Sequence, residues 1–152
     1  MFRNALCCAA VAEPVSPVFT ERRVARADEI DELGHVSNIE IVRWIQDIAW
    51  AHSIAVGWDV DRYRAVGAVF VVRRHEIDYL RPVMAGDEVE VQTWIESWTG
   101  AASIRATRVR RLADGVAVAA GATQWVFVSI ASGRPRRIPA DVATAFLRGN
   151  PR

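Results

Sequence analysis

The most regular pattern of apolar positions lies in the first half of the chain. Four bulky side chains recur there at the spacing of one helix face: Ile41, Trp44, Ile45 and Ile48. Ser37, followed three positions later by Glu40, forms a capping box that marks a helix start. Gly57 is a typical C-terminal stop. The pattern therefore predicts a long amphipathic helix over roughly 38–56.

After Gly57 the pattern changes to the two-residue alternation and β-branched content of strands. Turn sequences such as Ala113-Asp114-Gly115 separate the apolar stretches from one another. The expected strands are Val18–Ala27, Ala68–Tyr79, Glu88–Trp98, Ser103–Leu112 and Val116–Ile130. A short helix over Ala140–Leu147 follows Pro139 and is the last predicted element.

This order of elements predicts one α+β domain over residues 18–152, with a long helix beside an antiparallel sheet. The short connections are expected to force the last four strands to be antiparallel neighbours. The predicted strand Val116–Ile130 is too apolar to remain a bare edge or a bare face. We therefore expect a homodimer or homotetramer.

Residues 1–17 carry two prolines and no periodic pattern, which predicts a loose leader. Arg3 and the apolar run Ala5–Ala12 weakly resemble a signal peptide, but the run is about half the length that spans a bilayer. A frayed leader or a misplaced start codon is the alternative. A cytoplasmic location, with no membrane association, is the default expectation.

Composition and charge exclude several classes of function. The 19 basic and 18 acidic residues give a formal charge of +1, which argues against binding to nucleic acid or to membrane surfaces. Every basic residue is arginine, and the absence of lysine excludes Schiff-base enzymes and a Walker A loop. The two cysteines, Cys7 and Cys8, are adjacent, and no cluster has metal-ligand spacing. We expect no metal and no cofactor.

The carboxylates and the three histidines remain as candidates for chemistry. His52 lies in the apolar stripe of the predicted helix and is interpreted as a core or interface residue. His75 lies in a predicted strand and is interpreted as a surface or interface residue. His35 differs because it lies just before the start of the long helix.

The segment from Asp31 to Asn38 leads directly into that helix. A helix start offers free backbone N–H groups and the positive end of the dipole, which can hold a developing oxyanion. The alternative is that Asp31, Glu32 and Ser37 only cap the helix.

The stretch Asp31-Glu-Leu-Gly-His-Val-Ser-Asn38, followed by Trp44, resembles the D-x-x-G-H-V-x-N signature of hot-dog-fold acyl thioesterases. This is the group of 4-hydroxybenzoyl-CoA thioesterases and acyl-CoA thioester hydrolases, and acyl-ACP thioesterases carry a similar motif. Further stretches agree in order and spacing: Val71–Pro82, Ala85–Val91, Asp114-Gly115 and Gln124–Val128. The resemblance covers about residues 18–147. It implies a five-stranded antiparallel sheet wrapped around one helix, and a dimer or tetramer with active sites at the interface.

The resemblance also implies roles for individual residues. Asp31 matches the catalytic carboxylate, as base for water or as nucleophile, and His35 matches the histidine of the acyl-ACP branch. Ser37 and Asn38 match the helix start that binds the oxyanion. The chain departs from the pattern at Ile41, where an aromatic residue is frequent, and at Leu33, where the acyl-ACP branch has asparagine. Asp31 is therefore expected to be the main actor, with His35 as a positioning or substrate-contacting group.

A thioester has a good leaving group, so a positioned carboxylate and an oxyanion hole suffice for its hydrolysis. The expected substrate is an acyl-CoA or an acyl-carrier protein, with the acyl group in an apolar slot between helix and sheet. Arginine suits the phosphates of coenzyme A. The candidates are Arg73, Arg74, Arg105, Arg108, Arg110 and Arg111, each of which also fits a solvated strand face.

Two other functions fit the same resemblance. A hot-dog dehydratase or hydratase would carry a G-D-x-N-P-x-H or H-x-P-x-x-P-G run, and the chain has neither. A non-catalytic acyl-thioester-binding protein would share the pocket and would tolerate the loss of Asp31. The sequence leaves the acyl group and its carrier open.

Overall fold

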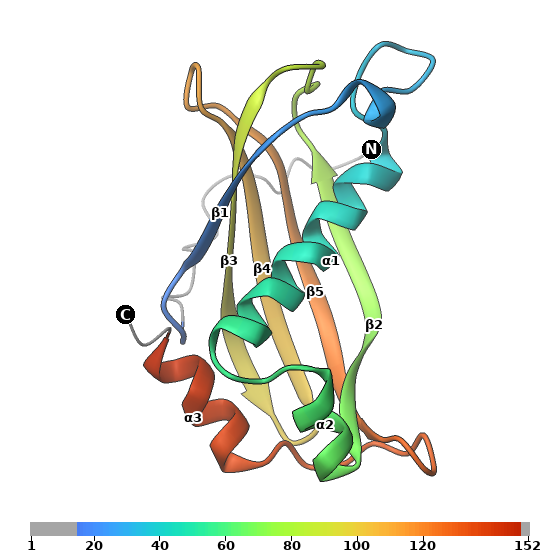
Figure 1. Cartoon of the computed structure of the whole chain (residues 1–152), viewed down its shortest axis with the longest axis vertical. Helices are drawn as coiled ribbons and strands as arrows, with labels where there is room; N and C mark the ends of the chain where they lie inside the picture. The colour runs from blue at the N-terminus through green and yellow to red at the C-terminus, as the bar shows by residue number, and fades with distance from the viewer. Residues whose placement is uncertain (1–14, 150–152) are drawn as a thin grey trace, which may run out of the picture.

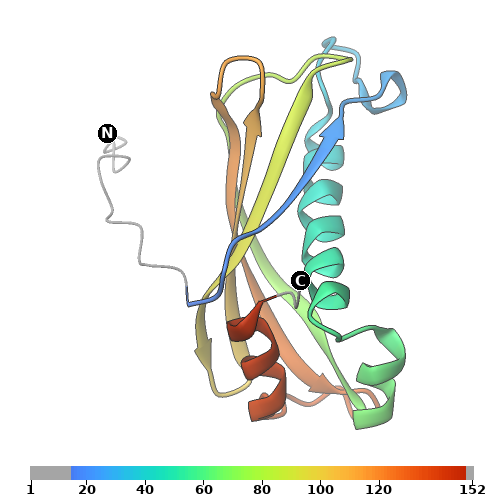
Figure 2. The same cartoon turned by 60° about the vertical axis from the view of Figure 1, so that its left-hand side comes forward.

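A computed structural model describes residues 15–149, and its five strands form one antiparallel sheet with a long helix across one face (Figure 1). The elements in chain order are β1 (Phe19–Val24), the 3-10 turn η1 (Ala27–Glu29), α1 (Asn38–Ala55), α2 (Val60–Val66), β2 (Ala68–Tyr79), β3 (Glu88–Thr99), β4 (Ala102–Arg111), β5 (Ala117–Ser129) and α3 (Ala140–Arg148). Figure 2 shows α1 lying along the sheet, with α2 and α3 at the end opposite to the start of α1. The expected α+β architecture is confirmed.

The strand order is β1-β3-β4-β5-β2, so the expectation that β2 and β3 are neighbours is wrong. The connection over residues 80–87 crosses the end of the sheet instead of forming a hairpin. Its eight residues can span about 26 Å, whereas crossing three strand spacings takes only about 14 Å. A connection of this length therefore does not force adjacent pairing.

The crossing connection is held in place along its length. The N–H of Leu80 donates to the carbonyl of Val118 on β5. The N–H of Val36 donates to the carbonyl of Val83, and that of Gly86 to the carbonyl of Ala25. The connection thus joins β5, the segment before α1 and the end of β1.

The same topology confirms that the predicted strand Val116–Ile130 is not a bare edge. β5 lies between β4 and β2, and its backbone pairs with both of them. The edges are β1 and β2. β2, with 12 residues against six in β1, is the longer edge and offers more outer backbone groups for pairing.

The start of α1 follows the predicted chemistry in part. The Ser37 hydroxyl accepts a hydrogen bond from the Glu40 N–H at 3.3 Å, as in a capping box. The Glu40 carboxylate instead pairs with Arg43 at 2.9 Å. From this start, α1 buries Trp44, Ile45 and Ile48 against the sheet, which makes the helix the centre of the core.

The helix α2 was not predicted, and the interpretation of strands directly after Gly57 is wrong. The Asp59 carboxylate accepts a hydrogen bond from the Arg62 N–H at 2.9 Å, and Gly67 ends the helix with a φ of 71°. Tyr63 of α2 is buried with its neighbour Trp58 in a second core cluster, which also includes residues of α3. These caps were visible in the sequence, but seven residues are too few for a clear apolar period.

The predicted leader lies mostly outside the described residues, which begin at residue 15. The Val15 N–H donates to the carbonyl of Ile95 at 2.9 Å, and the Ser16 hydroxyl accepts from the Ile95 N–H at 2.8 Å. The last residues of the predicted leader are therefore attached to β3. None of the helices in the described range 15–149 is long and apolar enough to cross a membrane.

Candidate active site

A closed loop places Asp31 beside the start of α1. Ile30 and Val36 form an antiparallel bridge, and the Ser37 N–H donates to the carbonyl of Glu29 at 2.9 Å. The chain between them must reverse within a few residues, and Gly34 does this with a φ of 83°. The two ends of the loop, at Ile30 and Val36, are therefore held side by side.

The Asp31 carboxylate is half-buried and is oriented by the loop itself. Its Oδ1 accepts hydrogen bonds from the N–H of Leu33 at 2.9 Å and of His35 at 3.4 Å. Its own N–H donates to the carbonyl of His35 at 2.8 Å. Within residues 15–149, no side chain or backbone group bonds to Oδ2. One oxygen thus fixes the group and the other is available to a substrate.

The first N–H groups of α1 are the second part of the site. The Ser37 hydroxyl is already engaged by the Glu40 N–H, and the Ile41 N–H donates to the carbonyl of Ser37. The N–H groups of Asn38 and Ile39 have no acceptor in the described part of the chain. Free N–H groups at the positive end of a long helix can bind an anionic oxygen.

Asp31, His35 and Asn38 line one cavity of about 330 Å³. Its opposite wall is the end of β2 and the crossing connection, residues 79–83, together with Val118 of β5. The structure thus brings together three of the four residues predicted for the reaction. The fourth, Ser37, caps the helix and is not among the residues that line this cavity.

Glu29 precedes the Asp31 loop and links it to α1 through buried contacts, and the sequence pattern did not indicate this role. The residue is 3% exposed, and its carboxylate accepts hydrogen bonds from the Arg26 N–H at 2.8 Å and from the Trp44 indole at 3.0 Å. Arg23 lies 3.4 Å from the same carboxylate. Burial alone raises the pKa of Glu29, but these hydrogen bonds and the charges of Arg23 and Arg26 outweigh it, so the pKa lies below 4.5. The carboxylate is therefore ionised at neutral pH.

The other two histidines lie away from this cavity. His52 is buried in α1, which confirms its interpretation as a core residue. His75 on β2 accepts a hydrogen bond from the Gln46 amide at 3.1 Å and bonds the Thr123 hydroxyl at 2.9 Å through its other nitrogen. This bridge joins α1, β2 and β5, and burial lowers the pKa of His75.

The candidate arginines for coenzyme A phosphates do not form one cluster. Arg73 and Arg74 are exposed on the edge strand β2, and Arg74 pairs with Glu76 at 3.0 Å. Arg108 is exposed on β4 over Trp94.

The remaining arginines are placed differently. Arg105 is buried inside the molecule, in a position that suits a small group rather than a surface nucleotide. Arg110 and Arg111 are engaged by Glu90 at 2.8 Å and by Asp114 at 3.0 Å. Arg81, which the sequence reasoning did not select, lines the Asp31 cavity.

Comparisons with known proteins agree with this architecture. The family model described as the thioesterase-like superfamily matches residues 25–146. The oleoyl-acyl carrier protein thioesterase 1 of Arabidopsis thaliana, a chloroplastic protein, is 22% identical over 135 residues, which are 85% of this chain and 37% of the relative. The chain thus spans little more than a third of the length of that relative.

Two solved structures share the fold at low sequence identity. A putative oleoyl thioesterase from Lactobacillus plantarum superposes with a TM-score of 0.82 at 18% identity, over 86% of this chain and 51% of the other. A 1,4-dihydroxy-2-naphthoyl-CoA thioesterase from Synechocystis superposes with a TM-score of 0.78 at 16% identity, over 86% and 96% of the two chains. With the family match over most of its length and this architecture, the chain belongs to the thioesterase-like superfamily and has the hot-dog fold.

Proposed function

We propose that the protein hydrolyses acyl thioesters at the Asp31 cavity. The observation that supports this most directly concerns two residues that line one cavity. Asp31 has a carboxylate oxygen that no described residue bonds, and Asn38 has a free N–H at the start of α1. A thioester needs a base or nucleophile on one side of its carbonyl and an oxyanion site on the other. Asp31 and the N–H groups of Asn38 and Ile39 supply these two functions.

In the proposed reaction, Asp31 takes a proton from water as the water oxygen attacks the thioester carbonyl carbon. The negative charge that develops on the carbonyl oxygen is held by the Asn38 and Ile39 N–H groups. The carbon–sulfur bond then breaks, and the thiolate leaves and is protonated. Direct attack by the Asp31 carboxylate, followed by hydrolysis of the anhydride, uses the same two groups.

His35 has a positioning role in this proposal. Its backbone N–H donates to Asp31 Oδ1, and its carbonyl accepts from the Asp31 N–H. The half-buried imidazole lines the cavity, so it can contact the acyl group or the thiol. Its substitution by alanine should therefore cost less activity than the loss of Asp31.

The substrate class in this proposal is an acyl-CoA or an acyl-carrier protein. One similar structure is named as a CoA thioesterase, and the plant relative as an acyl carrier protein thioesterase. Arg81 at the wall of the cavity is the arginine best placed to meet a phosphate of either carrier. Arg73, Arg74 and Arg108 remain candidates for more distant contacts.

A hydrolysis screen tests the proposal. The purified protein is incubated with acyl-CoAs and acyl-carrier proteins of different acyl groups, and the released thiol is measured with a chromogenic reagent. We expect turnover that is unchanged by EDTA, because the proposed site consists of a carboxylate and backbone donors. Activity that disappears with EDTA and returns with zinc would contradict this mechanism.

We also propose that the protein forms a dimer or tetramer. β2 is an edge strand of 12 residues, and its exposed apolar side chains include Val71 and Tyr79. Pairing along this edge would bury both the unpaired backbone and these side chains. Light scattering at micromolar concentration should give at least twice the mass of one 16.9 kDa chain. A particle of one chain's mass would refute the proposal.

A further inference from the structure

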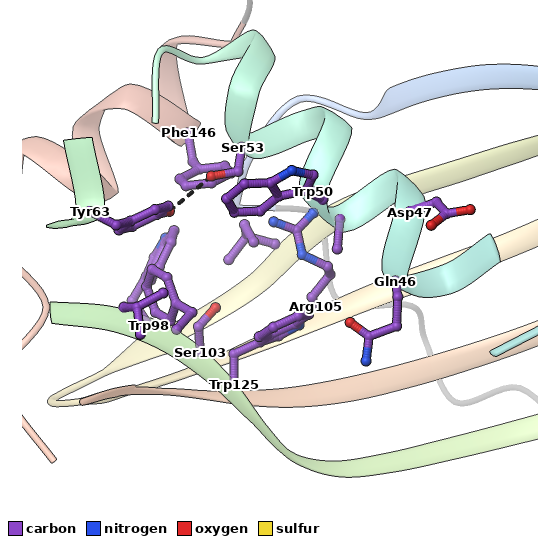
Figure 3. Close-up of a pocket in the computed structure, with 14 residues that line it drawn as sticks. Gln46, Asp47, Trp50, Ser53, Tyr63, Trp98, Ser103, Arg105, Trp125 and Phe146 are labelled. Carbon is purple, nitrogen blue, oxygen red and sulfur yellow. Dashed lines mark hydrogen bonds between the residues drawn. The ribbon is translucent and has the colours of Figure 1, made fainter. Parts of the chain in front are cut away.

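A second cavity lies between α1 and the sheet, at the end where α2 and α3 pack (Figure 3). Its volume is about 350 Å³, within the range of small-molecule sites. Six of the residues that line it are aromatic: Trp50, Tyr63, Phe70, Trp98, Trp125 and Phe146. The proposed hydrolytic reaction uses none of these residues.

Arg105 of β4 is the charged group in the interior of this cavity. Its side chain rises from the sheet toward α1, in the middle of the labelled residues of Figure 3. The residue is 5% exposed, and its Nη1 donates to Nδ1 of His52 at 2.9 Å and to the Thr93 hydroxyl at 3.2 Å. Burial and the neighbouring guanidinium lower the pKa of His52 to about 3, so this imidazole is neutral at pH 7. Both partners of Arg105, His52 and Thr93, are therefore uncharged.

No carboxylate of residues 15–149 forms an ion pair with Arg105. Asp47, the carboxylate that lines the cavity, is more than half exposed and lies 3.5 Å from Arg23 instead. Burial lowers the pKa of Arg105 to about 10, which still leaves it charged at neutral pH. A buried charge without a counter-charge is costly, so the arrangement calls for an anion.

Three further polar groups, on residues that line this cavity, lack a hydrogen-bond partner in the described chain. The indole N–H groups of Trp98 and Trp125 and the hydroxyl of Ser103 are buried, and nothing in the described chain accepts or donates a hydrogen bond there. Buried polar groups in folded proteins are satisfied in the great majority of cases. Because protein encloses these three atoms, the feature that points to a ligand is the charge of Arg105, whose partners in the structure are neutral.

We propose that this cavity binds a molecule with one carboxylate on an aromatic or aliphatic body, and that Arg105 is the charge partner of the carboxylate. A guanidinium matches a carboxylate in charge and in planar geometry. The aromatic walls suit the apolar body of the molecule. A phosphate carries nearly twice the charge and fits one cation in apolar walls less well.

The carboxylate could belong to a free acid or to the far end of a long acyl group. Two hydrogen bonds, from Gln46 to His75 and between His75 and Thr123, join α1 to the sheet. They lie on the side of this cavity that is nearer to the Asp31 cavity. Asn38 and His52 are 14 residues apart on α1, which is about 21 Å at 1.5 Å per residue. Only an acyl chain of roughly palmitoyl length would therefore reach from one end to the other.

Calorimetric titration of the full-length protein tests the proposal without reference to hydrolysis. The probes are 4-phenylbutyrate and octanoate, each compared with its neutral amide. We expect each carboxylate to bind at least tenfold more tightly than its amide. In Arg105→Met this preference should disappear, whereas Arg108→Met, on the same strand but exposed, should keep it. The comparison of acid and amide on the unmodified protein remains decisive if Arg105→Met does not fold.

A second measurement, which rests on the proposed function, identifies the source of the carboxylate. Hydrolysis of hexadecanedioyl-CoA is compared with that of palmitoyl-CoA. If the cavity takes the acyl end, Arg105→Met lowers kcat/KM for the diacid thioester at least tenfold and leaves palmitoyl-CoA unchanged. If it takes a free acid, both thioesters are unaffected while acid binding is lost.

The proposal is overturned if acid and amide bind equally, if neither binds at millimolar concentration, or if Arg105→Met retains the preference. Titration of Asp31→Asn separates the two proposals. This variant should bind 4-phenylbutyrate as the native protein does, whether or not hydrolysis occurs at Asp31. A failed hydrolysis screen would therefore refute the proposed function without refuting the proposed carboxylate site.

Discussion

Replacement of Asp31 by asparagine should lower kcat for thioester hydrolysis at least ~10²-fold, about 3 kcal/mol of barrier, with a nearly unchanged melting temperature. The fold should persist because the amide oxygen of asparagine can accept the same hydrogen bonds from Leu33 and His35 that Oδ1 accepts now. The variant loses only the basic and nucleophilic oxygen. Steady-state kinetics and thermal denaturation on the same preparation measure both quantities.

Glu32→Gln is the matched control, because Glu32 is the adjacent carboxylate and is exposed. It should retain nearly native turnover. Full activity in a folded Asp31→Asn would place the chemistry elsewhere, with Glu32 and Asp28 as the next carboxylates to test. If neither the native protein nor Asp31→Asn hydrolyses any thioester but both bind acyl-CoA, the protein is a binding protein and the proposed reaction is refuted.

Glu29→Gln should destabilise the protein by about 3 kcal/mol at pH 7. Glutamine can accept from the Trp44 indole or from the Arg26 N–H, but one of its two positions becomes a donor that faces another donor. It also removes the charge that faces Arg23 at 3.4 Å in a buried position. For a chain of this size the melting temperature should fall by about 6–12 °C.

The effect of Glu29→Gln depends on pH in a defined direction. The folded-state pKa of Glu29 lies below 4.5, so its ionised form stabilises the fold above that pH. This stabilisation is lost as the pH falls through the folded-state pKa. The difference between native and variant melting temperatures should therefore be full at pH 7 and should narrow below about pH 4.5. A constant difference down to pH 3 would show that the charge of Glu29 is not its cause.

Glu76→Gln provides the contrast for this experiment. Glu76 also pairs with an arginine, Arg74 at 3.0 Å, but both side chains are about 70% exposed. Exposed pairs contribute little to stability because water and salt screen them. This variant should change the melting temperature by only a degree or two. An equal loss in both variants would contradict the special role of the buried carboxylate.

The parts of the fold that depend on local chemistry could be predicted from the sequence. The helix predicted over 38–56 is α1 within one residue, because the Ser37 cap and the Gly57 stop act on their nearest neighbours. The loop with Asp31 and His35 was predicted from a motif, and its geometry depends on hydrogen bonds within seven residues. Local signals of this kind are written in consecutive positions.

The parts that were missed depend on contacts between distant segments. Glu29 meets Trp44 across 15 positions, and Arg105 meets His52 across 53. No periodic pattern distinguishes a buried arginine on a strand from an exposed one. The pairing of β2 with β5 likewise depends on where the chain goes after Tyr79, which strand propensity does not encode. Asp31, His35 and Asn38, which line one cavity, could therefore be selected from the sequence, whereas Glu29 and the second cavity could not.

The crossing connection over residues 80–87 has a practical consequence for protein engineering. A tag, reporter or extra loop is usually placed in an exposed turn, and Met84 to Gly86 are exposed. An insertion there would displace Val83. This residue lines the Asp31 cavity, and its carbonyl accepts a hydrogen bond from the Val36 N–H before α1. The turn at Ser132-Gly133, beyond the other end of β5, is equally exposed and lines neither cavity. Labels for single-molecule or display work therefore belong at that turn.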